Sequence, residues 1–360
     1  MKIAVVAVSY PNLSETFISR EAEALAARGH DVVVLTKHAP QPGPIAPTTR
    51  LRVVPWTNED VHRERPDVLY AMLGLLAHQR AYDISREHGF PVVYRVWSGQ
   101  DTFVMPTPSF YEVASSHRHC RGVLVEDEFM AKYATREMRV RANRIHVVPN
   151  SINLDTFAPV FKNNGTVNVL TVARFVEKKG LIHGIRAFNA AHKLCTGSVY
   201  RIYGYGPEEE RLRAAAGPGV FIHPAVTYEQ LPGLYGEADV FLAPCIKTPS
   251  GDADGFPTTA LEAMASGLPV IASDLLTAPC YIEPYHNGML VPPGDESALE
   301  DAIVALCLSS GEMRQRLGNE ARKFALEHLD LSRNIVAIES VLRDGAAASG
   351  VLAAAGGHRR

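Results

Sequence analysis

Short, almost wholly apolar runs alternate with helical patterns along this chain, and the alternation limits the possible folds more than any other feature. The runs begin with KIAVVAV and DVVVLT and end with PVIAS and MLVPP. Strands that are covered on both faces must be apolar throughout, as in parallel sheets. Intervening segments such as residues 15–28 and 296–307 carry apolar residues at three- and four-residue spacing, as covering helices do. The pattern predicts an α/β protein with two doubly wound parallel sheets.

The length of the chain and the composition of one loop divide this pattern into two domains. A chain of 360 residues is long for a single core, and a segment rich in Asn and Pro at 148–166 separates the two series of runs. We therefore predict one domain over residues 1–155 and a second over residues 165–330. Residues 331–343 are expected to form a terminal helix that can return to the first domain, and residues 344–360 a flexible tail.

Charge and cysteine content argue against several classes of function. The 36 Lys and Arg residues are scattered among 39 Asp and Glu residues, so we expect no nucleic-acid partner. The five cysteines form no CxxC pair, which predicts reduced thiols and a cytoplasmic location. No apolar run approaches the roughly 20 residues of a membrane span. Arg136, Arg139, Arg141 and Arg144 could form a small basic face for weak membrane association, and a solvated face is the alternative.

The segment DGFPTTALEAMASGLPVIAS, residues 254–273, has the layout of an anion-binding site. Gly255 lets the backbone approach a ligand closely, and Pro257 suits the first turn of a helix. The helix that follows directs free N–H groups and a positive dipole end towards an anion. Glu262 lies one turn further, where a carboxylate can accept bonds from ribose hydroxyls, and Asp254 precedes the turn within reach of a sugar. The alternative is a capped helix on which Glu262 is solvated.

A second candidate anion site follows an earlier strand-like run. The sequence ARFVEKKG at 173–180 places Arg174 and Lys179 after the strand, where two cations suit a diphosphate. A Gly-x-Gly-Pro turn that contains Gly204 and Gly206 ends another run and precedes an acid-rich helix start. A solvated basic turn and an ordinary connecting loop are the alternatives.

Polar residues of the first half supply further candidates for ligand contact. Ser14 is placed to cap the helix after the first strand. Ser98, Gln100 and Asp101 follow the fifth strand-like run and would point into any cleft between the domains. An ordinary helix start and a polar loop are the alternatives for these two segments.

Taken in order, these motifs resemble the retaining family 4 glycosyltransferases of the GT-B fold, also described as group 1 glycosyl transferases. The opening YPNLSETFISRE is most similar to exopolysaccharide-type members. The resemblance covers residues 2–330 and includes VPNSINLDTFAP, ARFVEKKG, the GYGP turn, LPGLYGEADVFLAP and NGMLVPPGD. It implies two Rossmann-like domains that face a cleft, with the acceptor on the N-terminal side and the nucleotide sugar on the C-terminal domain.

The resemblance also implies roles for individual residues. Arg174 and Lys179 would hold the donor diphosphate, Glu262 the ribose hydroxyls, and Asp254 the transferred sugar. The remaining donor contacts would come from two turns, one of which lies beside the nucleotide base: Gly255, Phe256, Pro257, Thr258, Gly204 and Gly206.

Two positions depart from the family pattern. The chain has SGQD at 98–101 where many relatives have HGHD or HG-x-D, so Ser98 replaces a histidine that meets the transferred sugar. Asp254 stands where the family usually has Glu and is one methylene shorter. We hypothesise that both changes tune the donor pocket, for a sugar altered at C6 or at C3 or C4. The alternative is weakened or lost activity.

The implied reaction is a hexosyl transfer with retained configuration from a nucleoside-diphosphate sugar, most commonly a UDP sugar. The acceptor would be a small-molecule, saccharide, lipid-linked or secondary-metabolite hydroxyl. If the departing diphosphate takes the acceptor proton, stabilisation of its charge by Arg174 and Lys179 dominates catalysis. No metal cofactor is expected, because Asp252 and Asp254 lie in the sugar-binding turn.

Three other functions are alternatives to this one. A nicotinamide oxidoreductase would carry GxGxxG after the first strand, and this chain does not. A nucleotide-sugar epimerase on the same fold would release nucleotide without an acceptor. A catalytically weakened sugar-nucleotide-binding subunit is the alternative that is not an enzyme. Acceptor-dependent release of nucleotide distinguishes the glycosyltransferase from the last two.

Overall fold

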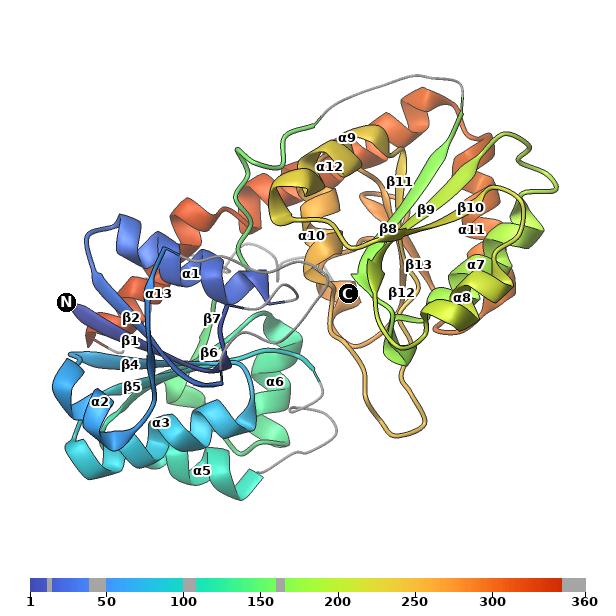
Figure 1. Cartoon of the computed structure of the whole chain (residues 1–360). Helices are drawn as coiled ribbons and strands as arrows, with labels where there is room; N and C mark the ends of the chain where they lie inside the picture. The colour runs from blue at the N-terminus through green and yellow to red at the C-terminus, as the bar shows by residue number, and fades with distance from the viewer. Residues whose placement is uncertain (12–14, 39–49, 100–107, 160–165, 345–360) are drawn as a thin grey trace. The chain divides into compact units, whose positions relative to one another are not determined.

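The computed structural model describes residues 1–11, 15–38, 50–99, 108–159 and 166–344 (Figure 1). It divides the chain into two compact units: unit 1 comprises Met1–Ser151 and the segment from Leu331, and unit 2 comprises Ile152–Asp330. Each unit has its own parallel sheet, of seven strands in unit 1 and six in unit 2. The predicted fold class, α/β with two Rossmann-like doubly wound sheets, is confirmed. The tail predicted at 344–360 lies beyond the described residues, except for Asp344.

The sheet of unit 1 has the strand order β3-β2-β1-β4-β5-β6-β7, and all neighbours are parallel. Its strands are β1 (Lys2–Ser9), β2 (Asp31–His38), β3 (Arg52–Pro55), β4 (Val68–Met72), β5 (Val92–Val96), β6 (Cys120–Val125) and β7 (Ile145–Val147). Its helices are α1 (Thr16–Ala27), α2 (Asn58–Glu64), α3 (Leu75–His88), α5 (Pro108–Ser116), α6 (Glu128–Arg136), α13 (Leu331–Asp344) and the 3₁₀ turn η1 (Ala142–Arg144).

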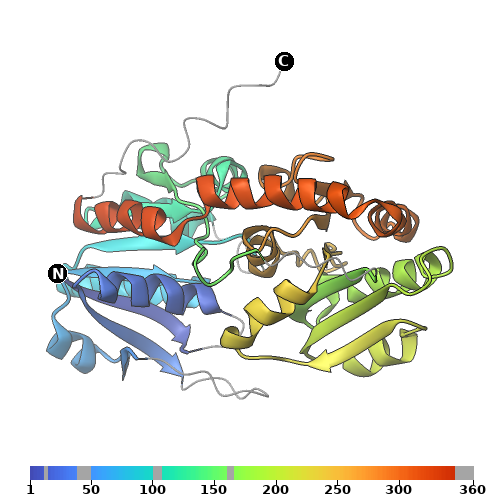
Figure 2. The same cartoon turned by 90° about the horizontal axis from the view of Figure 1, so that it is seen from above.

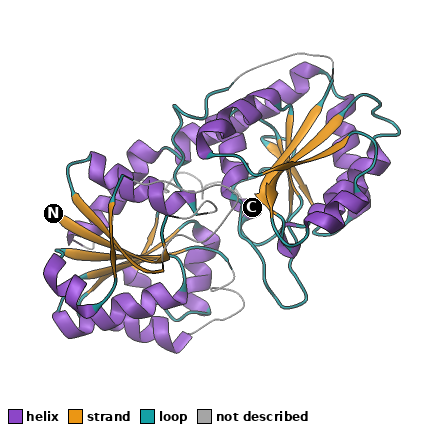
Figure 3. Ribbon diagram, viewed as in Figure 1, coloured by secondary structure: helices purple, strands orange, loops and turns teal. Residues whose placement is uncertain are grey.

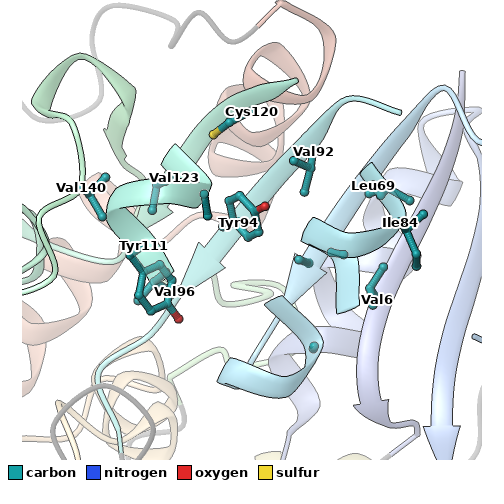
Figure 4. Close-up of a cluster of buried hydrophobic side chains, with 14 of the residues drawn as sticks. Val6, Leu69, Ile84, Val92, Tyr94, Val96, Tyr111, Cys120, Val123 and Val140 are labelled. Atoms are coloured by element: carbon teal, nitrogen blue, oxygen red, sulfur yellow. The ribbon is translucent and has the colours of Figure 1, made fainter. Parts of the chain in front are cut away.

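Alternate side chains of the central strands enter two separate cores, one on each face of this sheet. Ala4 and Val6 of β1 pack with residues of α2, α3, α5 and α6, in the cluster that Figure 4 shows. Ile3 and Val5 pack with residues of α1 and α13 on the other face. Burial on both faces explains why these strands are apolar throughout.

The terminal helix α13 belongs to unit 1, although it follows unit 2 in the sequence. It packs against β4, β5, β6 and α1, and its Glu339 carboxylate accepts a 2.7 Å bond from Arg28 Nε of the α1 C-cap. The chain therefore leaves unit 1 once and returns to complete one of its two cores.

The sheet of unit 2 has the order β10-β9-β8-β11-β12-β13 and is also parallel. Its strands are β8 (Asn168–Arg174), β9 (Val199–Tyr205), β10 (Val220–Pro224), β11 (Val240–Ala243), β12 (Val270–Ser273) and β13 (Gly288–Val291). Its helices are α7 (Leu181–Ala191), α8 (Glu209–Ala215), α9 (Leu231–Glu237), α10 (Thr258–Ala265), α11 (Glu296–Leu308) and α12 (Gly311–His328), with 3₁₀ turns η2 (Glu177–Lys179), η3 (Tyr228–Gln230) and η4 (Ala278–Cys280).

Helices cover both faces of the second sheet as well (Figures 2 and 3). One core draws residues from α9, α10 and α12, and the other from α7, α8 and α11. Because the strands are parallel, the loops that follow β8, β9, β11 and β12 all leave from the same edge of the sheet. Within the described ranges, no helix has both the length and the apolar character that a membrane crossing requires.

Candidate active site

The turn after β8 holds two lysines against the end of β11. It forms η2 and ends at Gly180, which has a left-handed φ of 61° and is the N-cap of α7. A Cβ at Gly180 would lie 1.9 Å from the carbonyl oxygen of Pro244, directly after β11. Only glycine lets the turn approach so closely, and this contact fixes where Lys179, one residue earlier, is placed.

Four charged residues form a cluster at this edge, the lysine–aspartate cluster: Lys178, Lys179, Asp252 and Asp254. Lys178 Nζ lies 2.8 Å from Asp254 Oδ1 and 3.1 Å from Asp252 Oδ1. Lys179 Nζ pairs with the other oxygen of Asp254. All four side chains are mostly buried, with exposed fractions of 8 to 19%. Asp254 therefore bridges two ammonium groups, and the sequence analysis identified neither this bridge nor Lys178.

The cluster keeps its central pair ionised. Burial raises the pKa of Asp254, but Lys179 and Lys178 outweigh it and hold that pKa well below its usual range. Burial lowers the pKa of Lys179, and Asp254 more than compensates, so the net shift is upwards. The formal charges of the four residues cancel, and Arg174 at the end of β8 adds one positive charge.

Arg174 is an exposed cation at this edge. It ends β8, and its charge is close enough to lower the pKa of Lys179. Among the residues that the structure describes, no carboxylate forms an ion pair with its guanidinium. A planar cation of this kind can bind a phosphate through two parallel hydrogen bonds.

The helix α10 directs its N-terminus to the same edge. Pro257 is its N-cap residue rather than part of the predicted first turn, because its ψ of 137° is extended, and the helix begins at Thr258. Two contacts hold the preceding Phe256 in place. Its N–H donates to Thr277 Oγ1 at 2.7 Å, and its ring stacks on that of Tyr281 with the ring centroids 5.0 Å apart. Gly255 is buried.

A small hollow joins this helix start to the lysine turn. Lys179, Cys245, Pro257 and Thr259 line it together with the ends of β8 and β11. The N-terminus of α10 and the cationic turn thus open onto one space, which is the arrangement expected for an anionic ligand.

Glu262 is part of the interior of unit 2. It is 1% exposed, and its Oε2 accepts a 3.0 Å bond from the hydroxyl of Tyr235, which also donates to the carbonyl of Thr259. The alternative in which Glu262 is solvated is therefore wrong. Its contact with a ribose remains a prediction.

The two glycines of the GYGP turn permit a close approach of β9 to β8. A Cβ at Gly204 would lie 1.9 Å from the carbonyl oxygen of Ala173, and one at Gly206, with a φ of 153°, would lie 2.4 Å from that of Phe175. The turn is thus held directly beside Arg174. A contact of this turn with the nucleotide base remains a prediction.

The candidate residues of unit 1 are only partly described. Ser98 lies just after β5, and both its N–H (3.1 Å) and its hydroxyl donate to Glu126 Oε1. Ser14, Gln100 and Asp101 fall outside the described residues. The N-cap of α1 is Glu15, whose side chain makes no capping hydrogen bond. Sequence reasoning did not single out Glu126.

Comparison with known proteins agrees with this architecture. Residues 155–324 match the family model described as glycosyl transferases group 1, and residues 14–156 match that of glycosyltransferase family 4. An Anabaena HepE structure in complex with UDP-glucose superposes with a TM-score of 0.76 at 17% identity, over 95% of this chain and 99% of that one. Such a likeness shows the fold, which is that of the GT-B glycosyltransferases.

Relatives among characterised proteins match part of the chain. The amylovoran biosynthesis glycosyltransferase of Erwinia amylovora is 34% identical over 179 residues, which cover 48% of this chain and 43% of the relative. A GDP-mannose-dependent phosphatidylinositol monomannoside mannosyltransferase of Mycobacterium tuberculosis is 28% identical over 183 residues, or 46% and 48% of the two chains. The matches span less than half of the length of these relatives.

The two family models match residues 14–156 and 155–324, and the chain therefore belongs to the group 1 glycosyltransferases of family 4.

Proposed function

We propose that this chain transfers a sugar, with retained configuration, from a nucleoside-diphosphate sugar to a hydroxyl of a saccharide or lipid-linked acceptor. The observation that carries the proposal is the joint opening of the lysine turn and the α10 N-terminus onto one hollow, with Arg174 exposed beside it. Membership of the family supports the reaction class. The neighbour solved with UDP-glucose favours a uridine donor, and the GDP-mannose-dependent relative makes GDP the second choice.

In this mechanism the protein stabilises the leaving group. The bond between the sugar and the diphosphate breaks as the acceptor oxygen bonds to the sugar on the same face, and the diphosphate takes the acceptor proton. Arg174, Lys179 and the dipole end of α10 offset the negative charge that develops on the diphosphate. These groups supply the positive charge from the protein itself, so we propose that no metal ion is required.

Within the lysine–aspartate cluster, Lys179 can exchange its partner Asp254 for a bound diphosphate. An incoming diphosphate competes with Asp254 for the Lys179 ammonium, while Lys178 continues to neutralise Asp254. We propose that Asp254, held in this way, accepts a hydrogen bond from a hydroxyl of the transferred sugar.

The direct test is a nucleotide-release assay with UDP-glucose and GDP-mannose, with and without a panel of octyl glycosides. Acceptor-dependent release, with an α-linked product by NMR from these α-linked donors, is expected. Release that ignores the acceptor and yields an epimerised sugar would favour the epimerase. Donor binding without turnover in the presence of lipid-linked saccharides would favour a binding subunit.

Replacement of Glu262 by glutamine should raise the donor KM about 10-fold, because a carboxylate that accepts bonds from two ribose hydroxyls becomes an amide with one acceptor. The effect on kcat should be smaller, since the ribose does not react. Steady-state kinetics at varied donor concentration measure both constants. Glu312→Gln, at an exposed position of α12, is the matched control. An unchanged KM for Glu262→Gln would assign the residue to the core alone.

Replacement of Ser98 by histidine should change the preference among donors. It introduces the residue that many relatives have at this position, and it removes the hydroxyl that donates to Glu126 Oε1. Relative kcat/KM values for UDP-glucose, UDP-galactose, UDP-glucuronic acid and GDP-mannose measure the preference. Ser109→His, at an exposed position of α5, controls for an added imidazole. The same ranking in all three proteins would refute the tuning hypothesis.

A further inference from the structure

A buried carboxyl group lies at the carboxyl edge of the sheet of unit 1. Strands β5 and β6 are parallel neighbours, with Val96 opposite Val125, and Glu126 follows β6 directly. Ser98, two residues after the end of β5, donates both its N–H and its hydroxyl to the same oxygen of Glu126, Oε1. Glu126 is 6% exposed. Ligands of doubly wound sheets bind at this edge, beyond the carboxyl ends of the strands.

The charges that face Glu126 do not neutralise it. In the described part of the chain no cation forms an ion pair with it. The charge of Arg95 lowers the pKa of Glu126, but the Arg95 guanidinium is already paired with Glu21 at 3.1 Å and donates to the carbonyl of Val148 at 2.7 Å. Asp127 adds a negative charge beside it, fixed as the N-cap of α6.

Glu126 consequently retains its proton at neutral pH. Burial, followed by the charge of Asp127, raises its pKa to about 8, and the two bonds from Ser98 and the charge of Arg95 offset this only in part. The backbone N–H of Ser98 can only donate, so Oε1 is an acceptor and the proton belongs on Oε2. Oε2–H is then a hydrogen-bond donor on an uncharged group, a known use of an acid kept neutral.

This chemistry suits a neutral hydroxyl and not an anion. Among the described residues, a phosphate or carboxylate would meet no cation that forms an ion pair with Glu126, and it would face the charge of Asp127. A sugar hydroxyl is uncharged, so its oxygen can accept a hydrogen bond from Oε2–H without a cation beside it.

We propose that the Glu126 carboxyl, positioned by Ser98, binds a hydroxyl of the sugar substrate by donating from Oε2. The inference rests on the proposed function and deepens it. The hydroxyl belongs either to the transferred sugar or to the acceptor saccharide, and the kinetics distinguish them. Ser98 is a positioning residue, because it acts through Glu126.

The test measures KM between pH 6.5 and 9.5 in two arms. The first follows hydrolysis of UDP-glucose or GDP-mannose without an acceptor, and the second follows transfer to octyl glycosides. In the wild type, KM for one substrate should rise roughly 10-fold as the pH passes through the pKa of Glu126, because the donated proton is lost. A change in the donor KM in the first arm identifies the transferred sugar, and a change only in the acceptor KM identifies the acceptor.

Three variants separate this role from a structural one. Glu126→Gln should keep the low KM at every pH, since the amide N–H donates in place of Oε2–H and does not titrate. Glu126→Ala should show the high KM, roughly 10-fold above wild type, at every pH. Ser98→Ala removes a bond that lowers the pKa of Glu126, so the rise in KM should move to higher pH. The exposed neighbour Glu128→Gln should follow the wild type.

The outcomes also separate this inference from the proposed function. If the wild type turns over a donor but Glu126→Gln shows the same alkaline rise, or Glu126→Ala keeps the wild-type KM, the hydroxyl contact is refuted and the transferase stands. If the wild type turns over neither donor in either arm, both proposals fail. Circular dichroism and thermal unfolding of each variant show that the compared proteins are folded.

Discussion

Replacing Lys179 by methionine is expected to lower kcat about 1,000-fold, the loss typical of removing a preorganised charge aimed at a developing negative charge. Lys179 lies at the hollow where the α10 N-terminus opens, and burial strengthens its interaction with a leaving diphosphate. The fold should survive, because Lys178 still neutralises Asp254 at 2.8 Å. Methionine keeps most of the side-chain volume. Nucleotide release at saturating donor and acceptor measures kcat.

Two matched lysines make this prediction specific. Lys193→Met, at an exposed position after α7, should leave kcat unchanged. Lys178→Met should mainly lower the melting temperature, because it leaves Asp252 without its partner and Asp254 with one cation in place of two. A larger fall in kcat for Lys178→Met than for Lys179→Met would assign the diphosphate contact to Lys178.

The sequence predicts the turn that carries these lysines but not their pairing. Two cations followed by glycine after an apolar run indicate a helix start at a strand end, and the structure places Gly180 there as the N-cap of α7. The partner Asp254 follows only after three further strands, β9, β10 and β11, and no local pattern reports such a contact. Residue spacing also does not show that both neighbouring lysines of a 3₁₀ turn reach the same carboxylate.

The contact between Glu126 and Ser98 was not predicted from the sequence for a related reason. An acid directly after an apolar run reads as an ordinary strand end, and only strand order reveals its neighbour. Consecutive strands in a doubly wound sheet are often adjacent, so the residues after β5 and β6 could have been compared. That comparison would have placed Glu126 beside Ser98, although not the depth at which both are buried.

The apolar-run criterion also overlooked two strands, β3 and β10. Both are edge strands, at the ends of the orders in their sheets. Their side chains are partly exposed, and each contains proline and charged or polar residues, as edge strands generally do. Continuous apolar runs mark strands that are covered on both faces, so this criterion finds the central strands of the two described sheets but misses two of their four edge strands, β3 and β10.

A second large effect is expected from Arg95, whose guanidinium is completely buried in unit 1. It pairs with Glu21 at 3.1 Å and donates to the carbonyl of Val148 at 2.7 Å, while Glu21 also accepts from the hydroxyl of Tyr70 at 2.6 Å. Arg95→Met leaves the buried Glu21 carboxylate with no ion-pair partner among the described residues. Loss of one partner of a buried pair costs about 3–5 kcal/mol of unfolding free energy.

The unfolding of unit 1 can be followed separately. The two tryptophans of the chain, Trp56 and Trp97, both lie in unit 1, so their fluorescence during urea unfolding reports on that unit. Arg63→Met, which removes surface pairs with Glu59 and Asp60, is the control and should change the unfolding free energy by less than about 1 kcal/mol.

The double variant Arg95→Met/Glu21→Leu tests the physical cause. If the instability of Arg95→Met arises from an unpaired buried charge, removal of the Glu21 carboxylate should restore part of the lost free energy, even though a further native side chain is replaced. If the double variant is less stable than Arg95→Met by the full cost of Glu21→Leu alone, the two residues act independently. The loss would then come from the carbonyl group of Val148, which the guanidinium no longer satisfies, and the network would serve to fix the end of unit 1 rather than to balance charge.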